Sequence, residues 1–185
     1  SRGELNICGH LQDTAALTNV FTYDEELLKC MADPEALAYD NTKYFDRLVN
    51  KLATVSGFDF VQDVKIILFD EYGRIYSNWS MNYQDYQFLL EQDWVKKSRE
   101  NSGHIVWSMF SPAYIIGEEK GQTYISLSKS LLKDYTAGER VGTLVISIDQ
   151  KKFSDFLMEY AYDGDVAYVC VGDGAVLLAN DDRGL

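Results

Sequence analysis

Few side chains in this 185-residue sequence could perform catalysis. The two histidines, His10 and His104, stand far apart, so the sequence contains neither an HExxH motif nor a His/Cys zinc cluster. A serine or cysteine triad would have to use one of the two. The glycine patterns GxxxxGK(S/T) and GxGxxG, which bind phosphates, are also absent. We therefore expect no catalytic residue, no metal ion and no cofactor, and the enzymatic alternative that stays open is a small hydrolase with His104 as its base.

Non-covalent recognition is the chemistry that the sequence offers instead. Aromatic residues make up 14% of the chain, with 13 Tyr, 9 Phe and 3 Trp. The segment from residue 76 to residue 114 carries all three tryptophans and several tyrosines: Tyr76, Trp79, Tyr83, Tyr86, Trp94, Trp107 and Tyr114. Rings of this kind can line a pocket for a small organic molecule, or they can simply fill a core.

Two expected strands add hydroxyl groups to these rings. In the strand 124–128, Tyr124, Ser126 and Ser128 share one face, because strand residues alternate between faces. The strand 141–149 presents a mixed set on one face: Thr143, Val145, Ser147 and Asp149. A sheet with one face on helices and the other in water produces this pattern without any function. If the segment 76–114 covers the mixed face, the same pattern produces a pocket.

We expect a ligand site on this mixed face. Its walls would be Trp94 and Trp107, its floor Tyr124, Ser126 and Ser128, and its entrance would lie near Tyr114. Buried hydroxyls need hydrogen-bond partners, which the covering segment can supply. The competing interpretation is that both tryptophans fill the core.

The local patterns predict helices first and a sheet afterwards. Apolar residues spaced by three and four from Ile7 to Phe21 indicate a long opening helix, and Asp24 can cap its continuation. A further helix is expected from Asn41 to Val55. From residue 64 the period changes to two, which predicts an antiparallel sheet. The expected strands are 64–69, 74–77, 104–110, 122–131 and 141–149, with helices at 89–99 and 151–160 and a last hairpin at 166–171 and 175–179.

The composition narrows the possible partners and compartments. With 17 Lys and Arg against 29 Asp and Glu, the net charge is −12, which disfavours nucleic acid and anionic lipid. The longest apolar run, 166–171, is too short to cross a bilayer. Cys8, Cys30 and Cys170 cannot build a disulfide scaffold, although a Cys8–Cys30 bridge stays open beside free thiols. Because the chain opens with Ser-Arg-Gly, we expect an excised fragment.

The order of these elements resembles a known family. The segments that carry the resemblance are VKIILFDEYGRIY (64–76), WVKKSRENSGHIVW (94–107), YISLSKS (124–130) and VGTLVISID (141–149). Together with the opening helices they resemble the double Cache (PDC, PAS-like) ectodomain of YesM-type bacterial sensor histidine kinases, over nearly the whole chain.

The resemblance implies an α+β, PAS-like fold in which a long N-terminal helix packs on a central antiparallel sheet. Residues 1–29 would form that helix, 30–160 the membrane-distal Cache module and 161–185 the start of a truncated membrane-proximal module. Such a module lies on the extracellular face of the bacterial membrane between two transmembrane helices. It is no enzyme itself; it senses a small molecule and signals, as a homodimer, to the cytoplasmic kinase region of the same chain.

The resemblance also bears on the class of ligand. Many double Cache receptors for amino acids carry a Tyr seven residues before, and an Arg two residues before, a Trp-Tyr pair at the position of Trp94. Here those places hold Gln87, Gln92 and Val95. Loss of the arginine would remove a charge-assisted partner of the ligand carboxylate worth about 1.5–3 kcal/mol. We therefore expect a neutral sugar or polyol, and the functional alternative is a dimerisation or scaffolding ectodomain without a ligand.

Overall fold

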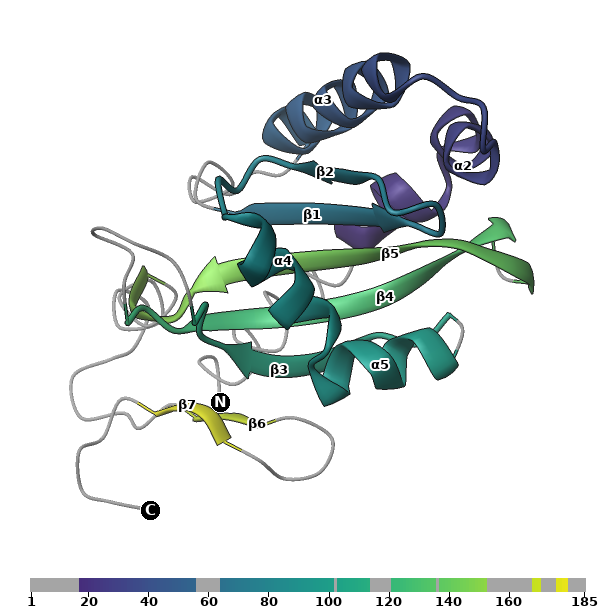
Figure 1. Cartoon of the computed structure of the whole chain (residues 1–185). Coiled ribbons are helices and arrows are strands. Elements are labelled where there is room, and N and C mark those ends of the chain that lie inside the picture. Colours follow the sequence, from purple (N-terminus) through teal and green to yellow (C-terminus); the bar gives the residue numbers. More distant parts are fainter. Residues whose placement is uncertain are drawn as a thin grey trace.

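An antiparallel sheet forms the centre of the structure, which is a computed structural model that describes residues 17–55, 64–101, 103–113, 121–135, 137–152, 168–170 and 176–179. Five strands pair in the order β2-β1-β5-β4-β3 (Figure 1). Their bounds are β1 Lys65–Asp70, β2 Ile75–Ser77, β3 Val106–Phe110, β4 Tyr124–Asp134 and β5 Ala137–Asp149. A separate hairpin joins β6 (Tyr168–Cys170) to β7 (Val176–Ala179). The helices and the antiparallel sheet confirm the expected α+β fold.

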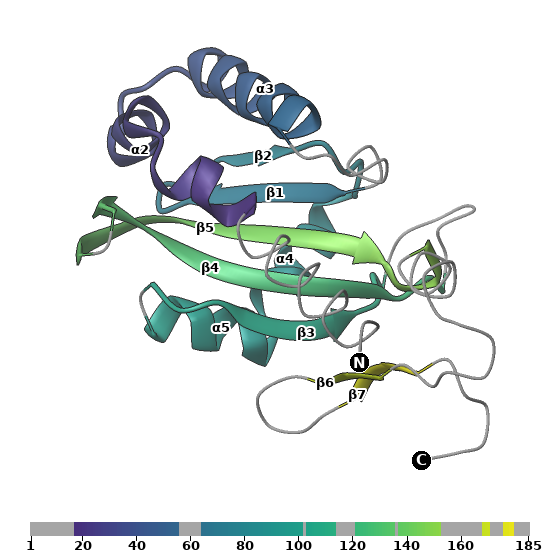
Figure 2. The same ribbon diagram turned by 180° about the vertical axis from the view of Figure 1, so that it is seen from behind.

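Helices cover both faces of the five-stranded sheet (Figures 1 and 2). The first face carries a helical segment at residues 17–22 together with α2 (Glu25–Ala32) and α3 (Ala38–Val55). The second face carries α4 (Tyr83–Leu90) and α5 (Asp93–Glu100). Strand alternation sorts the core between them: Ile66 and Leu68 point to the first face, whereas Ile67 and Phe69 point to the second.

The long helix expected at 1–29 is interrupted at residues 23–24, between the helical segment 17–22 and α2. Asp24 is the N-cap of α2, and its carboxylate accepts a hydrogen bond of 2.9 Å from the amide of Leu27, which confirms the expected cap. The α3 helix begins at Ala38, three residues before the expected start. Inside it, the Asn41 side chain is buried and donates to the Tyr76 hydroxyl at 2.9 Å, so that α3 is fixed to β2. Residues 1–16, where the opening helix was expected to begin, lie outside the described residues, and so does Cys8.

Later elements depart from the expectation at their ends. The single helix expected at 89–99 is two helices, because Gln92 adopts an extended conformation between α4 and α5. The strands β4 and β5 run further than expected and pair with each other beyond the end of β1. Most of the expected helix 151–160 lies outside the described range. In the part of the chain that the structure describes, no helix combines the length and apolarity that a membrane crossing requires.

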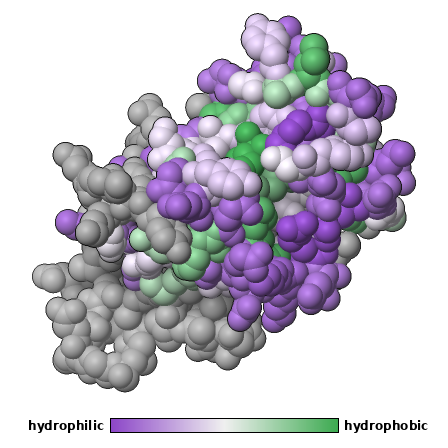
Figure 3. All heavy atoms as spheres, viewed as in Figure 1, coloured by the Kyte–Doolittle hydropathy of each residue, from purple (hydrophilic) through white to green (hydrophobic). Residues whose placement is uncertain are grey.

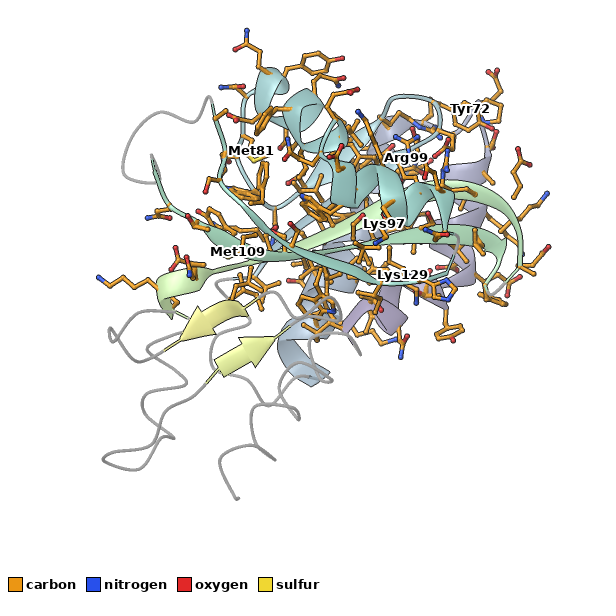
Figure 4. The ribbon with its side chains drawn as sticks, turned by 90° about the horizontal axis from the view of Figure 1, so that it is seen from below. Tyr72, Met81, Lys97, Arg99, Met109 and Lys129 are labelled. Carbon is orange, nitrogen blue, oxygen red and sulfur yellow. The ribbon has the colours of Figure 1, made fainter. Side chains whose placement is uncertain are left out.

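The short turn between β1 and β2 contacts helices on both sides of the sheet. Toward the second face, Glu71 accepts two hydrogen bonds from Arg140, at 2.8 and 3.0 Å. Arg140 also donates to the backbone carbonyl of Arg99 at the end of α5, at 2.7 Å. Toward the first face, the hydroxyl of Tyr72 donates to the carbonyl of Ala32 at 3.0 Å. Figure 4 shows Tyr72 and Arg99 on the same side of the molecule.

We expect Gly142→Ala to lower the free energy of unfolding. A Cβ at this β5 position would lie 2.6 Å from the carbonyl oxygen of Phe69 and closer still to the methyl group of Met31, so backbone and core would both have to shift. Such overpacking costs about 2–3 kcal/mol. The control is Gly73→Ala, where a Cβ meets nothing within 4 Å and only the left-handed φ of +84° opposes the change, at about 1 kcal/mol. Urea denaturation that gave equal losses for both variants would contradict the packing argument.

The ion pair of Glu71 predicts a pH-dependent contribution to stability. The hydrogen bond from Arg140 holds the pKa of the Glu71 carboxyl below its ordinary value of 4.5. A carboxyl with a lowered pKa stabilises the fold above its unfolded value and loses this effect as the pH falls through its folded value. Urea denaturation should therefore separate wild type from Glu71→Gln by at most about 1 kcal/mol near pH 7, and the difference in the free energy of unfolding should shrink steadily as the pH falls below 4.5. A difference that stayed constant over this fall in pH would show that the carboxylate charge is not involved.

Candidate ligand-binding site

Five aromatic side chains form a continuous layer on the second face. The ring centroids of Trp79 and Tyr124 lie 4.5 Å apart, and that of Trp79 lies 6.3 Å from Phe110. Phe110 also contacts Phe88 of α4 at 6.0 Å and Trp94 of α5 at 6.4 Å. Because Phe110 and Tyr124 pair directly across β3 and β4, the sheet register itself brings the rings together. We call these five residues the aromatic cluster.

Buried serine hydroxyls lie beside the aromatic cluster on the same face. The hydroxyls of Ser126 and Ser147 face each other across β4 and β5 at 2.7 Å. Ser128 lies 2.6 Å from Ser98 of α5. Ser98 gives its proton to the carbonyl of Val95, so Ser128 is the donor to Ser98. Of the two β4 hydroxyls, that of Ser128 is therefore bonded to the covering helix α5 and that of Ser126 to the neighbouring strand β5.

Two buried donors on this face, on Trp94 and Thr143, have no acceptor among the described residues. The indole N–H of Trp94 is buried without a hydrogen-bond partner. The Ser126–Ser147 pair has two hydroxyl protons, only one of which is used within the pair. On β5 the hydroxyl of Thr143 is also buried and without a partner within the described ranges. An unpaired buried donor costs about 1–3 kcal/mol, so an acceptor at this face would be bound favourably.

The structure brings together four of the six expected site residues. Trp94 and Tyr124 belong to the aromatic cluster, and Ser126 and Ser128 lie on the same face of β4. Tyr124 and Trp79 are both 1% exposed, and their rings are in contact. The indole ring of Trp79 therefore covers Tyr124, which was expected to form the floor of the pocket. The Tyr124 hydroxyl donates to Gln122 at 2.9 Å.

Trp107 corrects the expectation. It was expected beside Trp94, but it packs against the core of the first face. The cause is strand alternation. On β3, Val106 and Phe110 point to the second face, so Trp107, which follows Val106, points to the first. The sixth expected residue, Tyr114, lies outside the described residues.

Sequence reasoning missed Ser98 and Ser147 as members of the site. Ser98 lies four residues after Trp94, which places both on the inner face of α5. That spacing is visible in the sequence and could have identified Ser98. Ser147 was expected on the mixed face, but its pairing with Ser126 follows from the β4–β5 register, which the sequence alone does not fix.

His104 and two surface grooves lie apart from this face. His104 is exposed and its side chain makes no hydrogen bond or ion pair with any described residue. Within the described ranges no group of three His, Cys, Asp or Glu could hold a metal ion. Two open grooves lined by described residues have volumes of about 390 Å³, between α2 and the β4–β5 turn, and 470 Å³, along α3. Neither groove includes a residue of the expected site, and the surface over α4 and α5 is mainly hydrophilic (Figure 3).

Comparison with known proteins finds one solved structure that shares the fold. No family model and no curated protein matches this sequence. The ligand-binding domain of the Pseudomonas fluorescens chemoreceptor CtaA, solved with L-alanine, is 18% identical; the match covers 96% of this chain and 71% of that one, with a TM-score of 0.51. This value indicates a shared fold.

Two further solved structures have lower scores. The ligand-binding domain of the Campylobacter jejuni chemoreceptor Tlp3 with L-norvaline is 14% identical, covering 90% of this chain and 70% of that one at a TM-score of 0.44. An extracellular domain assigned to the histidine kinase rpHK1S-Z16 is 15% identical, covering 89% and 72% at a TM-score of 0.40.

We expect removal of two facing hydroxyls, those of Ser130 and Thr143, to change the free energy of unfolding in opposite directions. They sit opposite each other in the β4–β5 register, and only Ser130 has a partner, the Ser98 carbonyl at 2.7 Å. Thr143→Val keeps the side-chain shape and should raise the free energy of unfolding by about 1 kcal/mol, whereas Ser130→Ala should lower it by about 1 kcal/mol. Chemical denaturation measures both changes. A destabilised Thr143→Val variant would mean that this hydroxyl does have an acceptor.

Proposed function

We propose that this chain is the small-molecule-sensing ectodomain of a bacterial transmembrane receptor. In full, it would be the extracytoplasmic sensor of a YesM-type two-component histidine kinase, dimeric in the complete receptor. The observation that carries the proposal is the second face, where an aromatic cluster lies beside the unpaired indole N–H of Trp94 and the buried hydroxyl pair of Ser126 and Ser147. A core that served packing alone would gain stability by replacing these groups with apolar ones.

The shared fold supports this proposal independently of the site. Domains of the chemoreceptor type bind small molecules, and the solved examples hold L-alanine and L-norvaline. The resemblance to double Cache ectodomains, drawn from the sequence, points to the same class of receptor. The proposed division assigns the five-stranded sheet to the membrane-distal module, 30–160, and the β6–β7 hairpin to the start of a membrane-proximal module, 161–185.

The unpaired donors favour a ligand rich in acceptor oxygens. A sugar or polyol supplies hydroxyl oxygens to the donors and C–H groups to the rings without introducing a charge. The arginine of α5 is not available to a carboxylate, because Arg99 lies 3.6 Å from Glu71. An amino acid is the competing class, since Lys65 stands directly opposite Ser147 in the β1–β5 register. A dimerisation or scaffolding module without a ligand is the second candidate function, and the full burial of Tyr124 is the observation that favours it.

A thermal-shift screen of the chain with sugars, polyols, amino acids and carboxylates tests the proposal. A ligand at 100 times its dissociation constant adds about 2.7 kcal/mol of stability. We expect Trp94→Phe and Ser126→Ala to weaken the shift of a true ligand, because each removes one of the donors at the site. The matched control is Trp107→Phe, which makes the same change on the opposite face and should leave the shift intact.

Two results would argue against the proposal. A hit whose shift survives both Trp94→Phe and Ser126→Ala would place the site elsewhere. A screen without hits in all four classes, together with unchanged folding of both variants, would favour the scaffolding function.

A further inference from the structure

The turn between β1 and β2 is in contact with helices on both faces of the sheet. Within Asp70–Arg74, Glu71 contacts the end of α5 through Arg140, while Tyr72 and Arg74 contact the end of α2. The helix α5 carries Trp94 of the candidate site, and α2 packs on the opposite face. The contacts therefore pass around the end of the sheet rather than through its core.

On the α5 side, one carboxylate serves two guanidinium groups. Glu71 forms a two-point pair with Arg140 and lies 3.6 Å from Arg99. Paired hydrogen bonds between a guanidinium and a carboxylate fix both position and orientation. Because Arg140 also holds the carbonyl of Arg99, a movement of the last turn of α5 must displace Arg140 or Glu71.

On the α2 side, the turn supplies donors to carbonyl groups that a helix end leaves without partners. Tyr72 donates to the carbonyl of Ala32, the last residue of α2. The Arg74 guanidinium donates to the carbonyl of Asp33 at 2.9 Å and to that of Ala36 at 2.6 Å. These bonds fix the end of α2 and the start of the α2–α3 connection.

Asp70 makes the turn itself a stiff unit. Its carboxylate accepts from the backbone amides of Tyr72 and Arg74, at 2.9 and 2.8 Å, and is ion-paired with the Arg74 side chain. Asp70 is only 7% exposed, so little water competes for these bonds. Glu71 therefore cannot shift far without moving Tyr72 and Arg74.

We propose that the β1–β2 turn is the mechanical link that couples α5, above the candidate ligand site, to α2 on the opposite face. The role of this link in signalling rests on the proposed function, in which the ligand is held under α5 and changes the position of that helix. The link itself requires no ligand. It can therefore be tested on the free chain, and a failed ligand screen would not affect the result.

Hydrogen exchange of the backbone amides in wild type and Glu71→Gln provides the test. The variant removes the charge that holds Arg140 and touches no residue of α2. We expect exchange to become about three- to tenfold faster in the last turn of α5 and also in the last turn of α2. The amides of Leu144 and Ile146, in the middle of β5, report global unfolding, and the change in α2 must exceed theirs.

The matched control is Glu91→Gln, which removes the ion pair of 2.6 Å between Glu91 and Lys96 of α5. It makes the same chemical change and removes another ion pair to α5, at the start of that helix and without contact with the turn, so exchange in α2 should stay within about twofold of wild type. The reciprocal variant, Tyr72→Phe, removes the bond to Ala32 and should speed exchange in the last turn of α5.

The proposal fails if Glu71→Gln loosens α5 and leaves α2 unchanged. It also fails if Glu91→Gln loosens α2 as much as Glu71→Gln does, because the coupling would then run through the sheet. Since Tyr72→Phe is a conservative change of a half-exposed side chain, the reciprocal measurement remains decisive if Glu71→Gln folds poorly.

Discussion

Burial of both faces of β4 and β5 is the constraint on which the rest of the structure depends. Residues 141–148 are all buried, and so are residues 124–128. Because alternate residues point to opposite faces, Leu144 and Ile146 need apolar cover on one side, while Val145 and Ser147 need cover on the other. Two helical layers are therefore required. A register shift of one residue would exchange the two sets and leave serines against α2 and α3.

The two layers differ in the kind of contact that holds them. The first-face core is built mainly from aliphatic and phenylalanine side chains that need no direction, such as Leu48 and Phe21, although the buried hydrogen bond from Asn41 to Tyr76 also holds α3 there. On the second face, rings alternate with hydroxyls, and Ser98 joins α5 to β4 by directed bonds. Directed bonds fix a helix in one position more narrowly than apolar contact does, and they fail together when the helix moves. This difference makes α5 the layer better suited to a discrete change of position.

Much of the fold follows from local patterns, whereas the site depends on pairings between distant residues. Asp24 as a cap and the alternation of β4 and β5 are local signals, and both are confirmed. The predicted position of Trp107 was wrong because the expected strand, 104–110, did not specify which of its residues face which side of the sheet. The pairing with β4 decides this. The contact of Glu71 with Arg140 joins residues far apart in the chain, and no local sequence pattern predicts it. Sequence reasoning placed Tyr124, Ser126 and Ser128 on one face of β4, where the structure has them too, but it did not foresee that Ser98 and Ser147 lie beside them.

The distribution of the three tryptophans has a consequence for optical measurements. Trp79 and Trp94 lie on the second face, 1% and 9% exposed, whereas Trp107 packs half-buried on the first. Indole emission shifts to longer wavelength as its surroundings become more polar, so the natural fluorescence spectrum adds signals from two separate layers. Without Trp107, the emission would arise from the aromatic layer alone. The chain would then carry an intrinsic spectroscopic reporter of that layer, with no dye attached.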